Sequence, residues 1–372
     1  RPCVSCAGCS KRMVTSGIWR PVTIRYYDAA SISDYHVKQL SLTDQQAKLS
    51  NELEINNILP RALQAEVRIN TSFEGNTEKG ISQAITLQPG INHISIPSEV
   101  LSPVRWMPNG WGKPALYDFS AQIIVEDKVV AQQSHRIGLR TVRLVNEKDQ
   151  DGESFYFEVN GVPMFAKGAN YIPQDALLTN VTTERYQTLF RDIKEANMNV
   201  IRVWGGGTYE DDRFYDLADE NGILIWQDFM FACSVYELTP EFEANIRQEF
   251  IDNIKRLRHH ASLALWCGNN EMEMFVKQGT WVTKPTEVRD YLFMYERIIP
   301  EVLSEYDPDT FYWPASPSSG GSFDEPNDPN RGDVHYWEVW HGNKPFSEYR
   351  KYFFRYASEF GFQSFPSVKT LE

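Results

Sequence analysis

Short runs of alternating hydrophobic and polar residues fill residues 17–145 of the chain, separated by Gly, Pro and Asn. A period of two residues is typical of a strand with one buried face, because successive side chains point to opposite sides. Residues 18–27 are also rich in β-forming side chains. Regular short strands with turns between them predict a β-sandwich. The clearest runs are residues 64–69, 93–96, 121–125 and 129–134.

After about Asp151 the pattern changes to helices that alternate with apolar strands. Thr183 is expected to cap a helix, Gly222 to end the next one, and Thr239-Pro240 to open a third. A further helix is expected at residues 291–303. Helices between near-continuous apolar strands predict a parallel sheet with both faces covered. The predicted strands are residues 164–170, 199–204, 223–226, 262–266, 311–313, 334–336 and 355–360.

Seven strands by Glu359 fit a (β/α)8 TIM barrel that is truncated before its last strand, more than an open doubly wound sheet. Gly205-Gly206-Gly207 lacks the GxGxxG spacing that a phosphate-binding loop of an open sheet needs. The predicted fold is therefore multidomain, with a β-sandwich followed by an incomplete α/β barrel. Residues 316–330, rich in Ser, Gly, Pro and Asp, form a long loop, and such loops in compact domains are often functional.

The length and charge of the chain limit what it binds. At 372 residues, two or three domains are expected. The formal net charge is −13, and no Lys/Arg cluster offers the positive surface that nucleic-acid binding needs. No run approaches the ~20 apolar residues that span a bilayer. The sequence thus argues against nucleic acid and membrane as partners, weakly favours neutral or cationic substrates, and leaves the oligomeric state open.

The five cysteines fall into two groups. Cys3, Cys6 and Cys9 lie close together, but no fourth soft ligand follows at a fitting distance, so no metal site is predicted. Cys233 and Cys267 are expected to be buried free thiols, which slightly favours a reducing, cytoplasmic compartment. The chain begins without Met and without a signal-peptide pattern, so we expect it to be a piece of a longer polypeptide that carries any targeting signal.

Two glutamates follow predicted strands at the end where parallel barrels carry their chemistry. Glu271 comes directly after the fourth strand and Glu359 ends the seventh. These strands face each other across a barrel mouth, so the two carboxylates are expected to meet. Such a pair hydrolyses glycosidic bonds: one group protonates the leaving oxygen, and the other attacks the anomeric carbon or activates water. For any single glutamate, the alternative is a solvated charge or an ion pair with Arg.

Long motifs spread over nearly the whole chain resemble those of glycoside hydrolase family 2 β-mannosidases. Those that contain the glutamates are Trp266-Cys267-Gly268-Asn269-Asn270-Glu271 and Ser358-Glu359-Phe360-Gly361-Phe362-Gln363-Ser364. The others are Thr15-Ser16-Gly17-Ile18-Trp19-Arg20-Pro21-Val22, Asn109-Gly110-Trp111-Gly112, Phe165-Ala166-Lys167-Gly168-Ala169-Asn170, Val203-Trp204-Gly205-Gly206-Gly207 and Trp226-Gln227-Asp228-Phe229-Met230.

The resemblance implies a retaining exo-β-mannosidase that releases terminal mannose from an oligosaccharide or glycan by double displacement, without metal or organic cofactor. Glu271 would be the general acid/base, with a pKa raised by the charge of its partner, and Glu359 the nucleophile. Asn270 would hold the sugar hydroxyl at C2.

The resemblance also implies a set of pocket residues. The apolar walls would be Trp204, Trp281 and Trp337, and the polar contacts would be Asn170, Asp228 and Tyr336. Of these, Tyr336 would position the nucleophile. The alternative for the tryptophans is packing in the protein core, and for Asp228 and Asn170 it is ordinary loop hydrogen bonding.

By the same resemblance, residues 1–27 end a sugar-binding β-domain, residues 28–145 form an immunoglobulin-like sandwich, and residues 146–372 form the catalytic barrel. The chain departs from the family at Ala7-Gly8-Cys9-Ser10, where the family has Trp-Asp-Trp-Gly, and stops before the eighth strand. An open barrel exposes strand edges, so low activity or poor stability is expected. The alternatives are a related family 2 β-galactosidase or β-glucuronidase, and a non-catalytic carbohydrate-binding fragment.

Overall fold

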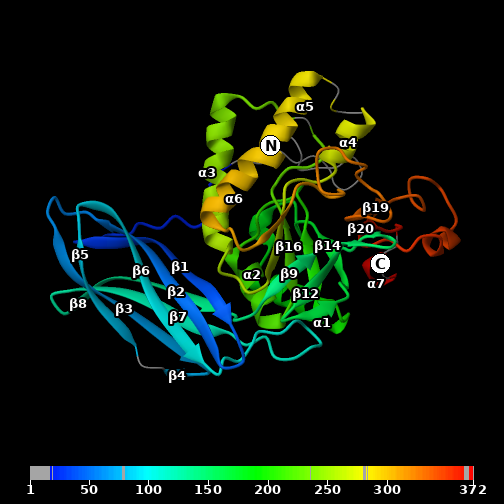
Figure 1. Cartoon of the computed structure of the whole chain (residues 1–372). Coiled ribbons are helices and arrows are strands. Elements are labelled where there is room, and N and C mark those ends of the chain that lie inside the picture. Colours follow the sequence, from blue (N-terminus) through cyan, green and yellow to red (C-terminus); the bar gives the residue numbers. More distant parts are fainter. Residues whose placement is uncertain are drawn as a thin grey trace.

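A computed structural model describes residues 17–18, 20–77, 80–234, 236–279, 282, 284–363 and 368–371. These residues form a β-sandwich and, beside it, an α/β unit (Figure 1). The predicted order, a sandwich followed by a parallel β/α region, is confirmed. No helix in the described part of the chain is both long and apolar enough to cross a membrane.

Two antiparallel sheets enclose the core of the sandwich. Burial alternates along their strands, as in β3, where Ala65, Val67 and Ile69 are buried and the residues between them are less so. All four predicted runs lie within strands. One sheet contains β1 (Ala30–Leu42), β2 (Gln46–Asn57) and β6 (Gly90–Leu101). The other contains β3 (Leu63–Phe73), β4 (Asn76–Thr77), β5 (Ile81–Leu87), β7 (Tyr117–Val125) and β8 (Lys128–Ile137).

Residues 20–27 form no strand, although their side chains favour one. Ile24 and Tyr26 are 73% and 85% exposed, and no described strand pairs with this segment. Strand propensity by itself does not make a strand, because the backbone groups need a partner ladder. The predicted sugar-binding part lies largely outside the described residues, and the three predicted domain limits stay a prediction.

Seven parallel strands follow, as the apolar runs predict. Five of them form one sheet: β14 (Gly168–Tyr171), β15 (Val200–Val203), β16 (Leu224–Asp228), β17 (Leu263–Cys267) and β18 (Phe311–Trp313). The other two, β19 (Val334–Tyr336) and β20 (Ala357–Phe360), pair with each other. Every residue of β15, β16 and β17 is buried, as expected for strands covered on both faces.

Helices lie between and after these strands along the chain. They are α1 (Thr183–Glu195), α2 (Asp212–Asn221), α3 (Pro240–Leu257), α4 (Met272–Gln278), α5 (Pro285–Tyr291), α6 (Ile299–Tyr306) and α7 (Val368–Leu371), with short 3-10 turns η1 (Leu178–Asn180) and η3 (Phe346–Arg350). Thr239 caps α3 as predicted, and Gly222 ends α2 with φ 70°. The cap of α1 is Thr182, one residue before the predicted Thr183, because the Thr182 side chain accepts the Arg185 N–H.

The single helix predicted at residues 291–303 has three parts in the structure. A π-helix, η2 (Leu292–Ile298), joins α5 to α6. Pro300 lies in the first turn of α6. Because proline has no N–H and its ring clashes with the carbonyl four residues earlier, the α-helical ladder cannot continue through this position.

A small sheet of β9 (Val142–Val145), β12 (Tyr156–Val159) and β13 (Val162–Met164) joins the two units, beside a hairpin of β10 (Lys148–Asp149) and β11 (Gly152–Glu153). Its buried residues share one core with the inward side chains of the barrel strands, among them Phe157 and Trp226. The sandwich is also fixed directly to the barrel: Trp106 donates its indole N–H to the Asp219 carbonyl, and Arg140 donates to the Ala261 and Leu263 carbonyls.

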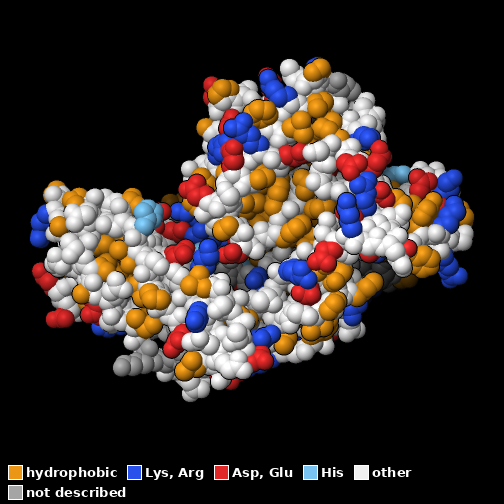
Figure 2. Space-filling view, viewed as in Figure 1, with side chains coloured by type: hydrophobic (Ala, Val, Ile, Leu, Met, Phe, Trp, Pro, Cys, Tyr) orange, Lys and Arg blue, Asp and Glu red, His pale blue; other side chains and the backbone are white. Residues whose placement is uncertain are grey.

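The barrel is open on one side, between β14 and β20. No ladder joins these two strands in the part of the chain that the structure describes, and the Asn170 amide links them by donating to the Ser358 carbonyl. Phe165 and Phe360 beside this gap are 84% and 60% exposed. In Figure 2, hydrophobic side chains gather at the right, over the segment that follows β19. Exposed strand edges are thus present, as the sequence predicts.

Candidate active site

Glu271 and Glu359 meet at the C-terminal ends of β17 and β20. Glu359 is the direct register partner of His335 on β19. His335 Nδ1 lies 3.0 Å from Glu271 Oε1 and 3.4 Å from Glu359 Oε2. This nitrogen and one oxygen of each glutamate all lie within 4.8 Å of one another. The structure therefore brings the two predicted carboxylates into one small space.

Arg202, in the buried strand β15, joins the polar residues of this site. Its five N–H groups each have an acceptor: Asp228 Oδ1 and Oδ2, Asn170 Oδ1, Asn270 Oδ1 and Glu359 Oε1. The Glu359 bond is 2.7 Å long, and the Arg202 side chain is 5% exposed. Burial acts to lower the pKa of Arg202, but the charges of Asp228 and Glu359 outweigh it and raise the pKa, so the guanidinium stays cationic.

Asp228 lies below the surface of the site, with no exposed side-chain area. Two Arg202 nitrogens, the Trp226 indole N–H and the Gly205 backbone N–H all donate to its carboxylate. These four donors fill its acceptor positions. The prediction that Asp228 is a polar contact for the sugar is therefore corrected: this carboxylate fixes the orientation of Arg202.

Two asparagines accept hydrogen bonds from Arg202. Asn170 lies on β14 as the register partner of Arg202, and it is exposed. Asn270 is buried; its carbonyl oxygen accepts from Arg202, and its amide nitrogen lies 3.2 Å from Cys233 Sγ. Backbone bonds from Asn270 N to Phe231 O and from Glu271 N to Ser316 O hold the segment that places the glutamate.

Glu271 has the left-handed φ of 64°, which is uncommon for residues other than glycine and often marks functional sites. Its Oε2 accepts from the thiol of Cys233 at 3.4 Å. Burial acts to raise its pKa, but the hydrogen bond and charge of His335 outweigh burial and lower it. The pKa of Glu271 is therefore lowered, whereas the sequence led us to expect a rise.

Not every aromatic residue of the predicted pocket contacts one of the two catalytic glutamates. The Trp337 indole N–H donates to Glu359 Oε2 at 3.2 Å. Trp204 is half-buried, and its ring lies against Gly206, where a Cβ would clash with it. Trp281 lies outside the described residues, as do Cys3, Cys6 and Cys9.

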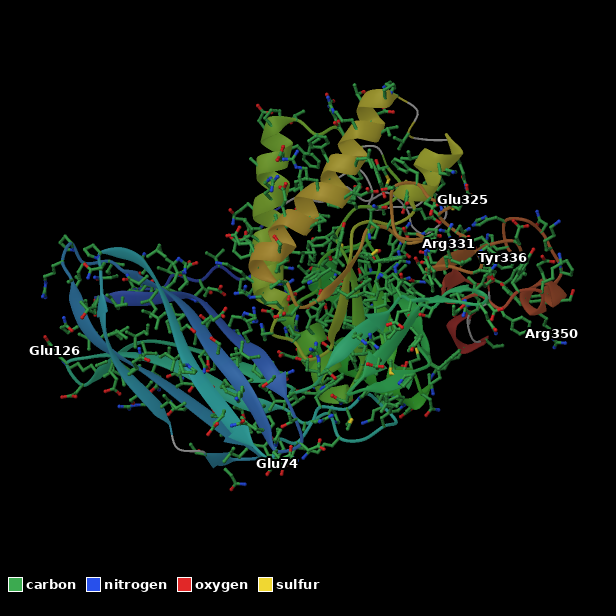
Figure 3. The ribbon with its side chains drawn as sticks, viewed as in Figure 1. Glu74, Glu126, Glu325, Arg331, Tyr336 and Arg350 are labelled. Atoms are coloured by element: carbon green, nitrogen blue, oxygen red, sulfur yellow. The ribbon has the colours of Figure 1, made fainter. Side chains whose placement is uncertain are left out.

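Tyr336 does not position the nucleophile. Its hydroxyl donates to Glu348 at 2.8 Å, and no bond from it to Glu359 is present. Successive strand residues point to opposite faces, so His335 and Trp337 face Glu359 while Tyr336 faces away. Figure 3 shows Tyr336 where the chain leaves β19 for the outlying segment that contains Arg350.

A cavity of about 1030 Å³ opens along the gap between β14 and β20. Asn170, Arg202 and Trp337 line it, but neither catalytic candidate does. The cavity is therefore a lateral opening that reaches the arginine from the open side of the barrel. Tyr336, Tyr349, Tyr352, Phe354, Tyr356 and Phe360 make much of its wall aromatic.

Among the described residues, one cluster has side-chain atoms spaced closely enough to hold a metal ion; it consists of Glu271, His335 and Glu359. Its surroundings oppose a cation, since Arg202 and Trp337 already donate to Glu359. A guanidinium on one oxygen of a carboxylate repels a second cation on the other. That no metal is required stays a prediction.

Sequence reasoning missed Arg202, His335, Ser316 and Asp333, and treated Cys233 as a buried thiol although it is half-buried at the site. A signal was present for Arg202, because an arginine within an apolar strand is rarely buried without partners. Ser316 and Asp333 carried no such signal, since polar residues in a Ser- and Asp-rich loop are ordinarily solvated.

Replacing Arg202 tests its role in the fold. Arg202→Met leaves Asp228 and Glu359 buried without their cation, and breaking a buried pair costs about 3–5 kcal/mol. We expect urea denaturation to show a loss of that size in the free energy of unfolding. The control is Arg143→Met, which removes a surface ion pair with Glu158. An Arg202 variant as stable as this control would contradict the assignment.

Glu273, buried in the first turn of α4, makes stability depend on pH. Burial raises the pKa of its carboxyl to about 7, although the Phe323 N–H donates to it. The folded state therefore holds a proton that the unfolded state releases above its ordinary pKa, so this group lowers stability as pH rises from about 4.5 to 7. We expect Glu273→Gln to remove about 3 kcal/mol of this pH-dependent loss in the free energy of unfolding, because one pKa unit corresponds to 1.36 kcal/mol.

Urea denaturation at pH 5 and pH 8 measures this loss, and Glu195→Gln, at an exposed position, is the control. An equal loss of stability between the two pH values in the Glu273 variant and in the unmodified protein would contradict the prediction.

Comparison with known proteins identifies the relatives of this chain. Residues 30–140 match the family described as Glycosyl hydrolases family 2. The chain is 37% identical to beta-mannosidase B of Aspergillus clavatus and 35% identical to that of Aspergillus terreus, over 97% of this chain and 43% of each relative. The chain thus spans less than half the length of these relatives.

Solved structures agree with the fold. Beta-D-mannosidase from Dictyoglomus thermophilum aligns with a TM-score of 0.88 and 37% identity, over 93% of this chain and 42% of that one. Beta-glucuronidase 2 of Bacteroides uniformis, at 18% identity and a TM-score of 0.68, shares the fold alone, over 85% of this chain and 38% of that one. The family match and the 35–37% identity to beta-mannosidases over nearly the whole chain show that the chain belongs to glycoside hydrolase family 2.

Proposed function

We propose that the protein is a retaining exo-β-mannosidase that hydrolyses terminal non-reducing β-D-mannose residues. The observation that carries this proposal is the short distance between the carboxylates, with one oxygen of Glu271 and one of Glu359 within 4.8 Å. Retaining glycosidases hold their carboxyl groups about 5–5.5 Å apart, whereas inverting ones leave about 6.5–9.5 Å for a water molecule. The choice of sugar is supported by the 37% sequence identity to a beta-mannosidase B, which extends over 97% of this chain.

In the first step, Glu359 attacks the anomeric carbon. Arg202 Nη1 and the Trp337 indole each donate to one of its carboxylate oxygens, which fixes its direction of attack. Glu271 gives a proton to the glycosidic oxygen as the bond from carbon to that oxygen breaks, and the leaving group departs as an alcohol.

In the second step, Glu271 accepts a proton from water while the water oxygen attacks the anomeric carbon. The bond to Glu359 breaks, and its electrons return to the carboxylate. Two inversions give net retention at the anomeric carbon. This sequence needs no metal or organic cofactor, because both proton transfers involve Glu271.

The sugar pocket in this proposal includes Trp337, which contacts the nucleophile, with Trp204 and Trp281 as further apolar walls. Asn270 supplies the contact to the C2 hydroxyl, and its place next to Glu271 supports this. Asn170 is exposed beside Arg202 and is available as a polar contact. The substrate is a neutral oligosaccharide or glycan.

Covalent trapping tests the roles of the glutamates. Treating the intact protein with 2-deoxy-2-fluoro-β-D-mannosyl fluoride should leave one label. The fluorine at C2 slows both steps, but the fluoride leaving group at C1 speeds the first one, so the glycosyl-enzyme intermediate accumulates. Peptide mass mapping is expected to place that label on Glu359, and Glu359→Gln should abolish it. A label on another residue would overturn the role assignment, and the absence of any label would favour a non-catalytic carbohydrate-binding protein.

The sugar preference is tested separately with a panel of 4-nitrophenyl β-glycosides. We expect kcat/KM for the β-mannoside to exceed that for the β-galactoside and β-glucuronide by more than about 10²-fold, which corresponds to roughly 2.7 kcal/mol in the transition state. The Glu359→Gln variant gives the background rate. Higher turnover of the galactoside or glucuronide would place the protein with those family members instead.

A further inference from the structure

Three buried polar residues beside the catalytic pair have no role in the mechanism above. Asp333 and Ser316 have no exposed surface, and His335 is 4% exposed. They form a continuous chain of hydrogen bonds: Asp333 Oδ2 to Ser316 Oγ at 2.6 Å, Ser316 Oγ to His335 Nε2 at 3.0 Å, and His335 Nδ1 to Glu271 Oε1 at 3.0 Å. A buried network of this kind fixes proton positions, because each member has few alternative partners.

The contacts of Asp333 determine which atom donates in each of these hydrogen bonds. The Trp313 indole N–H and the Ser318 backbone N–H, which can only donate, both donate to its Oδ1. The hydroxyls of Ser316 and Ser358 both lie 2.6 Å from its Oδ2. Four donors converge on one carboxyl group, which therefore binds as an acceptor-only carboxylate.

It follows that the single Ser316 proton points to Asp333. The Ser316 oxygen then accepts from His335, so Nε2 of His335 carries a proton. Asn327, from the long loop after β18, holds the strand in place: its side chain accepts the His335 backbone N–H and donates to the His335 carbonyl. The imidazole is thus fixed in tautomer and in position.

With Nε2 protonated, Nδ1 alone faces the two catalytic carboxylates. A bare nitrogen lone pair 3.0 Å from an ionised carboxylate would be repelled, so one proton lies between Nδ1 and Glu271. It is present either as an imidazolium beside a carboxylate or as a neutral imidazole that accepts from a carboxylic acid. The other charged or titratable groups here are Arg202, which binds Glu359, and Cys233, which donates to Glu271.

We propose that His335 is a positioning residue that shares with Glu271 the proton used in catalysis, and that Asp333 and Ser316 orient it for this purpose. The inference rests on the proposed function for its chemistry, but its geometry does not. The lowered pKa of Glu271 agrees with it, because the hydrogen bond and the charge of His335 are among the causes of that shift.

The proton balance is simple. In the first step, the pair loses one proton to the leaving oxygen through Glu271, and Glu359 becomes an uncharged ester. In the second step, the pair regains one proton from the attacking water, and Glu359 leaves the sugar as a carboxylate. Because the shared proton remains in the pair to a higher pH than it would on a lone glutamate, His335 extends the range in which Glu271 works as an acid.

Leaving-group dependence tests the proposal. His335→Asn keeps a polar amide near Glu271 but cannot take a proton. For mannobiose, whose sugar hydroxyl leaving group needs protonation, we expect kcat/KM to fall on the order of 10²-fold, within the usual contribution of a general acid. For 2,4-dinitrophenyl β-mannoside, which needs no acid, the fall should stay below about 10-fold.

The pH profile of kcat/KM is a second measurement, and a purely structural role of His335 would leave this profile unchanged. In His335→Asn, the basic limb of kcat/KM should shift to lower pH, because Glu271 then holds its proton alone. Ser316→Ala removes the acceptor for Nε2 without removing the imidazole, and a smaller shift in the same direction is expected. The control is exposed His93→Asn in the sandwich, which should leave both the leaving-group ratio and the profile unchanged.

Nitrogen NMR of 15N-histidine-labelled protein tests the tautomer without any turnover. The His335 signals are those missing from His335→Asn; we expect Nε2 protonated throughout, and Nδ1 shifted by the shared proton in the unmodified protein but not in Glu271→Gln. A protonated Nδ1 with bare Nε2, or equal losses with both leaving groups, would overturn the proposal. Failure of the proposed function would look different: no turnover of either mannoside by the unmodified protein, whatever the NMR result.

Discussion

The active site depends on one buried cation. Arg202 has no free N–H group. Its five acceptor atoms belong to four residues, three of them on strands and one in the segment after a fourth strand: Asn170 on β14, Asp228 on β16, Glu359 on β20 and Asn270 after β17. Removing a guanidinium and two carboxylates from water is costly, and only complete pairing offsets that cost. The same pairing fixes where these side chains lie relative to one another. The geometry of the nucleophile is therefore a consequence of how the buried charge is neutralised.

The two glutamates differ because their surroundings differ. Glu359 lies against a permanent cation and an indole donor, and these two hydrogen bonds hold its carboxylate in one orientation. Glu271 lies instead against His335 and the thiol of Cys233, neither of which is a permanent charge. An acid/base must change its protonation in every catalytic cycle, and a titratable neighbour allows this where a fixed cation would oppose it. Two residues of the same type thus take different roles through their hydrogen-bond partners.

The site has an opening on the side of the barrel between β14 and β20. Between β14 and β20 the Asn170 amide bonds the Ser358 carbonyl, and the cavity beside this contact reaches Arg202. Aromatic side chains cover part of the gap, while Phe165 and Phe360 remain largely exposed. The charged core around Arg202 is nevertheless shielded, since its own side chain and that of Asp228 are almost completely buried. Burial of the cluster therefore does not require a closed ladder around the barrel.

The sequence by itself determined the sandwich, the order of seven parallel strands and the two glutamates, because period-two alternation, continuous apolar runs and strand-end polar residues are local signals. It did not determine the extended chain at residues 20–27, whose β-forming side chains have no ladder, or the π-helix before Pro300. Only tertiary structure decided that Asp228 is fully buried, that Tyr336 faces Glu348, and that Ser316, Asp333 and His335 form one chain. These outcomes depend on which residues from distant segments share a buried space, and hydrogen-bond partners across that space leave no pattern along the chain.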